Sequence, residues 1–192
     1  KNVSLVLKKS DLHKALNVMH GQIFGISKKV NLAIFRHGNV GAALVDQILK
    51  SAKNIEERHG ILLNVFAVAN SRNILLNHNG ISKSWKSNLK DKGTFYTMDS
   101  VFAYAKRYHL ENLIAVDNTA SKDFVTHYLE FLDNGFDLVS SNKIANTLSF
   151  DYYRALREEL AKNQKQYLYE TNVGAGLPLI DTIKLLHRSG EN

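Results

Sequence analysis

Five short apolar runs alternate with amphipathic segments from residue 30 onward, and this alternation limits the fold more than any other feature of the chain. The apolar runs cover residues 30–35, 61–69, 113–116, 136–139 and 167–169. Segments with helical periodicity lie between them, at about 40–53, 98–108, 121–134 and 149–163. Short buried strands separated by amphipathic helices are typical of a parallel sheet with both faces covered. The pattern therefore predicts a doubly wound α/β fold with helices on both faces of the sheet.

Two parts of the chain depart from this alternation. Residues 71–97 are polar, and we expect a long excursion from the sheet with a short helix at about 81–89. Near the N-terminus, residues 2–7 alternate like a strand, and apolar residues recur at helical spacing between Ser10 and Gly25. We expect a separate strand and helix within residues 1–27 and one domain over residues 28–192.

Composition excludes several classes of protein. The chain has 192 residues, of which 44% are hydrophobic and 22% charged, as is ordinary for a globular domain. No apolar run approaches the roughly 20 residues of a membrane span, and no signal peptide is visible. Disulfides and thiolate zinc sites are excluded because the chain has no cysteine. We expect a cytoplasmic protein without a membrane partner.

The net charge of +7 indicates an anionic partner, which is either a nucleic acid or a small anionic ligand. The lysines are spread along the chain, with no Arg-rich arm and no basic strand that carries aromatic residues. We therefore expect no nucleic-acid partner, and we keep a basic nucleic-acid binder as a third alternative.

The clearest motif is Arg36-His37-Gly38-Asn39-Val40-Gly41, between the first apolar run and a helical segment. It nearly matches the G-x-G-x-x-G signature of a dinucleotide-binding Rossmann fold, but Arg36 stands in place of the first glycine. Gly38 lets the backbone approach a pyrophosphate, and Gly41 lets the helix pack close to the strand. The free N–H groups at the start of the helix attract phosphates. We therefore predict a Rossmann-type sheet with a cofactor site formed by all six residues.

The residues after the second apolar run, Asn70-Ser71-Arg72, indicate which dinucleotide binds. A NAD site usually has an acidic residue here for the ribose 2′-hydroxyl, and this chain has none. A guanidinium suits a 2′-phosphate, so we expect NADP rather than NAD. The alternative is a helix N-cap at Ser71 beside a solvated arginine. Arg36 is then either a second cation near the 2′-phosphate or an obstruction in the turn.

Polar residues also follow the third and fourth apolar runs. Thr119, Ala120 and Ser121 can contact the nicotinamide ribose, although Ser121 is also a good helix cap. Lys143 would lie near the reacting end of a cofactor, where it can protonate or orient a substrate oxygen. The alternative for Lys143 is a solvated surface lysine. No Ser/His/Asp arrangement is visible, so we expect hydride chemistry carried by the cofactor.

The loop after the fifth apolar run is Glu170-Thr171-Asn172-Val173-Gly174-Ala175-Gly176-Leu177-Pro178. It combines one carboxylate with several main-chain carbonyls that can face inward. Such a donor set suits a hard cation rather than zinc. The alternative is a plain strand-to-helix turn in which Glu170 pairs with a basic group.

Together, these strings resemble homoserine dehydrogenase, and most closely the dehydrogenase part of bifunctional aspartokinase–homoserine dehydrogenase. The matching strings are Phe35–Gly41, Val68–Arg72, Asp117–Ser121, Ser141–Asn146 and Tyr169–Pro178, and the last is the most specific. The resemblance covers about residues 30–192. Residues 1–25 resemble the end of a regulatory ACT region, so residues 1–27 are expected to be an ACT-like strand–helix remnant and linker.

The resemblance implies NAD(P)-linked interconversion of L-aspartate 4-semialdehyde and L-homoserine, in threonine and methionine biosynthesis. It gives Lys143 a catalytic and cofactor-contacting role, and Thr119 a contact on the nicotinamide side. It also implies a sodium ion held by Glu170 and the main-chain carbonyls of Val173, Ala175 and Leu177.

The family's substrate-binding and dimer-forming region would begin beyond Asn192. We therefore expect the full-length protein to be a homo-oligomeric, NADP-preferring homoserine dehydrogenase, and the 192-residue chain to be inactive. The alternative is a non-catalytic dinucleotide-fold module that has lost cofactor binding through Arg36.

Overall fold

A computed structural model describes residues 8, 12, 27–36, 38–174 and 176–189. Seven strands form one sheet in the order β4-β3-β2-β1-β5-β6-β7. Five of them run parallel: β1 (Lys28–Phe35), β2 (Ile61–Ala69), β5 (Leu113–Asp117), β6 (Phe136–Ser140) and β7 (Tyr167–Leu168). Each of these strands coincides with one of the predicted apolar runs. The Rossmann-type α/β fold predicted from the sequence is confirmed.

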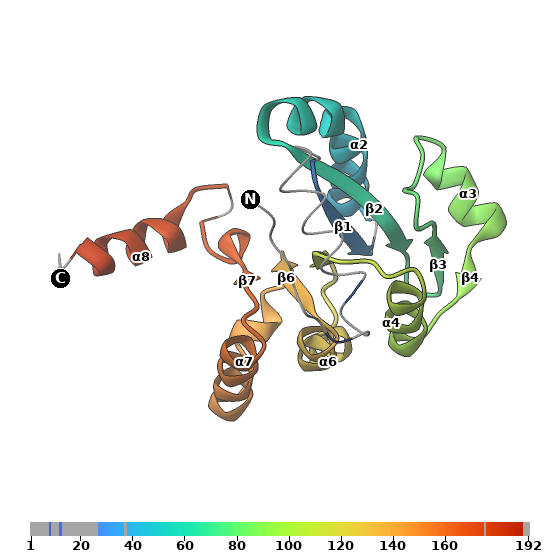
Figure 1. Ribbon diagram of the computed structural model, residues 1–192. Coiled ribbons are helices and arrows are strands. Elements are labelled where there is room, and N and C mark those ends of the chain that lie inside the picture. Colours follow the sequence, from blue (N-terminus) through green and yellow to red (C-terminus); the bar gives the residue numbers. More distant parts are fainter. Residues whose placement is uncertain (1–7, 9–11, 13–26, 37, 175, 190–192) are drawn as a thin grey trace.

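Helices cover both faces of the sheet (Figure 1). α2 (Asn39–His59) connects β1 to β2, and its Val45 packs on one face with Leu32, Ile34 and Val68. The opposite face is covered by α4 (Met98–Arg107), α5 (Lys122–Thr126), α6 (Tyr128–Asp133) and α7 (Phe150–Lys162). The helix predicted at 121–134 is thus divided into two short helices.

The sheet extends past β2 through two antiparallel strands that the sequence pattern did not predict. β3 (Asn73–Leu76) pairs with β2, and β4 (Thr94–Phe95) pairs with β3. The expected excursion at 71–97 was therefore wrong in part, because these residues return to the sheet. The short helix there is α3 (Trp85–Lys92), later than predicted.

A buried tryptophan fixes α3 against α2. Trp85 is fully buried, and its Nε1 donates a hydrogen bond to Asp46 Oδ1 at 2.8 Å. Lys86 Nζ forms an ion pair with the other oxygen of Asp46 at 2.7 Å. These donors lower the pKa of Asp46, first through Lys86 and then through Trp85.

β1 and β2 differ by one residue in register, which marks a β-bulge. Leu32 pairs with Val65, but Ala33 pairs with Ala67, so Phe66 is the extra residue on β2. A bulge places two successive side chains on the same side of a strand. Phe66 and Ala67 accordingly both pack into the cluster beneath α4.

The chain ends differ in what the structure describes. The strand predicted at residues 2–7 and most of the predicted ACT-like helix lie outside the described residues. At the other end, α8 (Leu179–Ser189) extends away from the sheet beyond β7 (Figure 1). Among the described helices, none is long and apolar enough to cross a membrane.

Candidate functional site

The parallel strands end level with one another, so the residues that follow them share one edge of the sheet. Phe35 at the end of β1 pairs with Ala69 of β2 on one side and with Asp117 of β5 on the other. Asp117 pairs in turn with Ser140 of β6. The chain runs from β1 to β2 in one direction and later returns to β5 on the other side of β1. Ligands of open α/β sheets bind outside the strand ends at such a reversal.

Arg36 adopts a backbone conformation that glycine adopts most easily. Its φ is +62°, in the left-handed region that favours glycine. The Arg36 N–H donates to the carbonyl of Ala69 at 2.9 Å, and the side chain is exposed. Arg36 holds this conformation although a non-glycine residue in this region costs about 1–2 kcal/mol. His37 lies outside the described residues.

The two remaining glycines of the motif have different surroundings. A Cβ added at Gly41 would collide with the carbonyl oxygen of Arg36 and lie 3.3 Å from Asn118 Nδ2. A Cβ added at Gly38 would meet nothing within 4 Å. Gly41 thus permits the close approach of α2 to β1, whereas Gly38 borders open space at the start of the helix.

The N-terminus of α2 is suited to an anion. Gly38 is its N-cap residue, without a side-chain cap hydrogen bond, and the first turn contains no acidic residue. Asn39 and Val40 are exposed at this end. Backbone N–H groups and the helix dipole both favour negative charge at such a terminus.

The Asn70-Ser71-Arg72 segment forms a turn at the end of β2. Asn70 Oδ1 accepts hydrogen bonds from the N–H groups of Arg72 and Asn73, each at 2.7 Å. Tyr96 supports the turn by donating its hydroxyl to the carbonyl of Asn70 at 3.2 Å. Ser71 caps no helix, because β3 begins two residues later. Arg72 is exposed after β2, the strand that pairs with β1, whose end Arg36 follows.

A buried hydrogen-bond network joins the ends of β5 and β6. The carboxylate of Asp117 is nearly inaccessible to solvent, and its Oδ1 accepts the N–H of Thr119 at 2.6 Å. Its Oδ2 accepts the hydroxyl of Tyr128 at 2.7 Å and the side-chain amide of Asn142 at 3.1 Å. Burial, and then the charge of Asp117, raise the pKa of Tyr128, so this tyrosine remains a donor.

Asn142 connects three loops of the site. Its side-chain amide also lies 3.1 Å from both Thr119 Oγ1 and the carbonyl of Ser121. Its Oδ1 accepts the N–H of Ile144 at 3.1 Å, and its own carbonyl accepts from Asn172 Nδ2 at 3.2 Å. The network therefore sets the backbone on both sides of Lys143.

The other residues predicted at these strand ends lie on the same edge. Ser121 caps α5, because its Oγ accepts the N–H of Phe124 at 3.2 Å. Ala120 is exposed, and Thr119 and Ser121 are half-buried. Lys143 is exposed at the end of β6, where it precedes the short 3-10 helix η2 (Ile144–Asn146). No role was predicted for Tyr128 or Asn142. Asn142 lies within the string Ser141–Asn146 that resembles the family, whereas Tyr128 lies in none of the matching strings.

The loop after β7 places Glu170 at the start of α8. Glu170 Oε1 accepts the N–H of Ile180 at 2.8 Å, and Oε2 accepts the N–H of Asp181 at 3.1 Å. The carboxylate thus caps α8, an arrangement that the helix dipole favours. The carbonyl of Leu177 accepts from the N–H of Leu179 at 2.8 Å, and Val173 is exposed. Ala175 lies outside the described residues, among which no group of three His, Asp or Glu side chains can hold a metal.

The fold and the strand-end geometry define a dinucleotide-binding domain of the Rossmann type. The chain belongs to the homoserine dehydrogenase family, since the family model for the homoserine dehydrogenase NAD-binding domain matches residues 37–170. This confirms the family suggested by the strand-end strings.

Relatives in several organisms agree with this assignment. The chain is 37% identical over 193 residues to a bifunctional aspartokinase/homoserine dehydrogenase of Buchnera aphidicola, covering all of this chain and 23% of that protein. It is 32% identical over 192 residues to the corresponding Haemophilus influenzae protein, with the same coverage of 100% and 23%. The chain thus spans about a quarter of the length of these relatives.

Solved structures share the fold. A homoserine dehydrogenase from Thermoplasma acidophilum superposes with a TM-score of 0.64 at 21% identity, over 82% of this chain and 48% of that chain. A hyperthermophilic archaeal homoserine dehydrogenase in complex with NADPH gives a TM-score of 0.62 at 24% identity, over 81% and 48%.

Proposed function

We propose that the chain is the cofactor domain of an NADP-preferring homoserine dehydrogenase that interconverts L-aspartate 4-semialdehyde and L-homoserine. The main support for this proposal is that four features lie at the same edge of the sheet, where the order of the strands reverses at β1. They are the start of α2, Arg72, Thr119 and Lys143. Bifunctional aspartokinase/homoserine dehydrogenases match the whole chain, which supports the same reaction for the full-length protein.

Each part of the dinucleotide has a counterpart at this edge. The pyrophosphate would lie at residues 36–41, over the open space beside Gly38. The ribose 2′-phosphate would lie between Arg72 and Arg36, whose strands are paired at Phe35 and Ala69. The nicotinamide ribose would contact Thr119, Ala120 and Ser121, whose loop the Asp117 network holds. His37 and Asn70 belong to the same proposed contact set.

Lys143 is the proposed catalytic residue. When bound, the reduced dinucleotide supplies a hydride to the carbonyl carbon of the semialdehyde. The C=O π electrons then become a bond between the oxygen and a proton, which gives the alcohol of homoserine. The Lys143 ammonium would orient that oxygen and supply or relay the proton, and the Asn142 bonds fix the backbone on which it stands.

The preference for NADP is tested by the affinities for NADPH and NADH. A charge-assisted bond from Arg72 to the 2′-phosphate contributes about 1.5–3 kcal/mol, so Arg72→Gln should weaken NADPH binding about tenfold or more. NADH binding should be unchanged. Arg58→Gln, at the far end of α2, removes the same charge and serves as the control. Equal affinity of the wild type for both dinucleotides would contradict the preference.

A sodium ion at Glu170 is part of the same proposal. The donors there are oxygens only, and each carboxylate oxygen accepts one N–H bond from the described residues, which leaves lone pairs for a hard cation. Main-chain carbonyls of Val173, Ala175 and Leu177 would complete the set. Thermal unfolding in NaCl and in choline chloride tests this: a sodium-specific stabilisation should vanish in Glu170→Gln.

The substrate region, the homo-oligomer and the cytoplasmic location stay predictions for the full-length protein, and the plant relatives are named as chloroplastic. We also propose that the 192-residue chain does not turn over by itself. Measurable oxidation of homoserine by this chain would refute that. Binding of neither dinucleotide would favour the alternative, a module that has lost its cofactor.

A further inference from the structure

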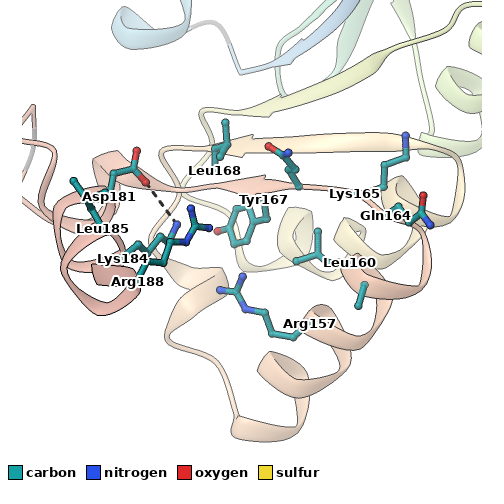
Figure 2. A pocket seen from close by; sticks show the side chains of 12 residues that line it. Arg157, Leu160, Gln164, Lys165, Tyr167, Leu168, Asp181, Lys184, Leu185 and Arg188 are labelled. Atoms are coloured by element: carbon teal, nitrogen blue, oxygen red, sulfur yellow. Dashed lines mark ion pairs between the residues drawn. The ribbon is translucent and has the colours of Figure 1, made fainter. Parts of the chain in front are cut away.

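We propose that a groove between α7, β7 and α8 binds a small polyanion, a molecule with two or more phosphate or carboxylate groups. The groove has a volume of about 930 Å³, a size typical of small-ligand sites. It lies beside β7, the last strand of the sheet, and it contains none of the residues assigned to the dinucleotide (Figure 2).

The charge of the lining is strongly one-sided. Four cationic side chains line the groove against one carboxylate: Arg157, Lys165, Lys184 and Arg188, with Asp181. Asp181 lies 3.7 Å from Lys184 in an exposed ion pair, which contributes little. Arg157, Lys184 and Arg188 turn toward the same end of the groove, beside Tyr167 (Figure 2). An anion at that end would be attracted by three cations from two helices.

Aromatic rings hold Arg157 in place before any ligand arrives. Its guanidinium carbon lies 4.8 Å from the ring centre of Tyr153, 5.9 Å from that of Tyr167 and 5.3 Å from that of Tyr169. Its Nη2 donates to the Tyr169 hydroxyl at 3.2 Å. A guanidinium fixed in this way loses little freedom when it binds, and its planar fork matches phosphate and carboxylate oxygens.

Two observations favour the binding of an anion at this end of the groove. Lys184 Nζ approaches the ring of Tyr169 at 5.2 Å, so two cations share one ring and repel each other. The Nε–H of Arg157 is buried and has no hydrogen-bond partner within the part of the chain that the structure describes. An anion between α7 and α8 would remove the repulsion, and a small rotation of Arg157 toward it would satisfy the N–H.

Calorimetric titration of the 192-residue chain with inorganic pyrophosphate and with citrate tests the proposal. The variant Lys184→Gln/Arg188→Gln removes two exposed cations from α8. Its affinity for the bound anion should fall about tenfold or more, because two charge-assisted contacts are lost. Arg157→Lys keeps the charge but loses the planar fork, and should also bind less tightly. Binding of pyrophosphate alone assigns the site to phosphates, and binding of citrate alone assigns it to carboxylates.

The matched control is Lys50→Gln/Arg58→Gln, which removes the same two charges from exposed positions on α2. It should bind both anions as the wild type does, and circular dichroism should show that every variant is folded. An equal loss in both double variants would show an effect of net charge alone and overturn the proposal. Undiminished binding in Lys184→Gln/Arg188→Gln would place the anion elsewhere, at the start of α2 for example, and no binding of either anion would also overturn it.

Discussion

Removal of the buried hydroxyl of Tyr128 tests how much the hydrogen-bond network around Asp117 stabilises the fold. Tyr128→Phe removes one oxygen atom and leaves the packing of the ring intact. That oxygen donates to the buried carboxylate of Asp117 at 2.7 Å and lies 2.8 Å from Ser140 Oγ. The substitution therefore removes the hydrogen bond to a charged group and the contact with Ser140 Oγ, without changing the shape of the ring.

The expected loss of stability follows from the partners that remain. Asp117 keeps the N–H of Thr119 and the amide of Asn142, and Ser140 Oγ still accepts the N–H of Asn142 at 2.9 Å. No group is left wholly unpaired, so the bond to the charged acceptor dominates the loss, which should be about 2 kcal/mol. For a chain of this length the melting temperature should fall by about 4–8 °C.

Tyr152→Phe is the matched control. The Tyr152 hydroxyl donates at 2.6 Å to the carbonyl of Val125, a neutral acceptor on the same face of the sheet. Its removal should cost only about 1 kcal/mol. Differential scanning calorimetry of both variants compares the two losses directly. If Tyr128→Phe is no more destabilising than Tyr152→Phe, the Asp117 network does not hold the site as described.

Three further predictions concern the turn and the buried tyrosines. Gly41→Ala should destabilise the fold by about 1–3 kcal/mol, because the added Cβ would collide with the Arg36 carbonyl. Gly38→Ala should leave stability unchanged and weaken dinucleotide binding, since its Cβ would lie in open space. Equal melting temperatures for the two variants would contradict this. Arg36→Gly should stabilise the fold by about 1 kcal/mol, since φ is +62°, and should weaken NADPH binding; tighter binding of both NADPH and NADH would instead identify Arg36 as an obstruction. Burial raises the pKa of Tyr128, of Tyr152 and of Tyr167, the last to about 12. Unfolded tyrosines lose their protons near pH 10, so the unfolded state then binds fewer protons than the native state. The contribution of these tyrosines to the free energy of unfolding is therefore complete below about pH 10 and is lost as pH rises toward 12. Unfolding curves that coincide at pH 8 and pH 11 would refute this.

The five parallel strands could be predicted from the sequence, because a buried parallel strand appears in the sequence as a continuous apolar run. β3 and β4 were not predicted, because neither strand forms a continuous apolar run. They are four and two residues long, lie in a polar segment, and exist only through pairing with β2 and with each other. Such non-local pairing has no periodicity that a single sequence displays.

The position of the site at the strand ends could be predicted from the sequence, but the hydrogen bonds that hold it could not. Parallel strands end together, so Arg36, Asn70 and Lys143 could be placed on one edge from their positions after apolar runs. Tyr128 occupies an apolar position of a short helix, and its bond to Asp117 depends on how α6 packs on β5 and β6. Glu170 likewise caps α8 across the loop between them, a contact that no local motif encodes.

A crystal structure of the chain with NADPH would show whether the dinucleotide binds at the strand ends. We expect the pyrophosphate at residues 36–41, the 2′-phosphate near Arg72 and Arg36, and the nicotinamide directed toward Thr119 and Lys143. Density for the dinucleotide away from the strand ends, or none at saturating NADPH, would rule out this binding site.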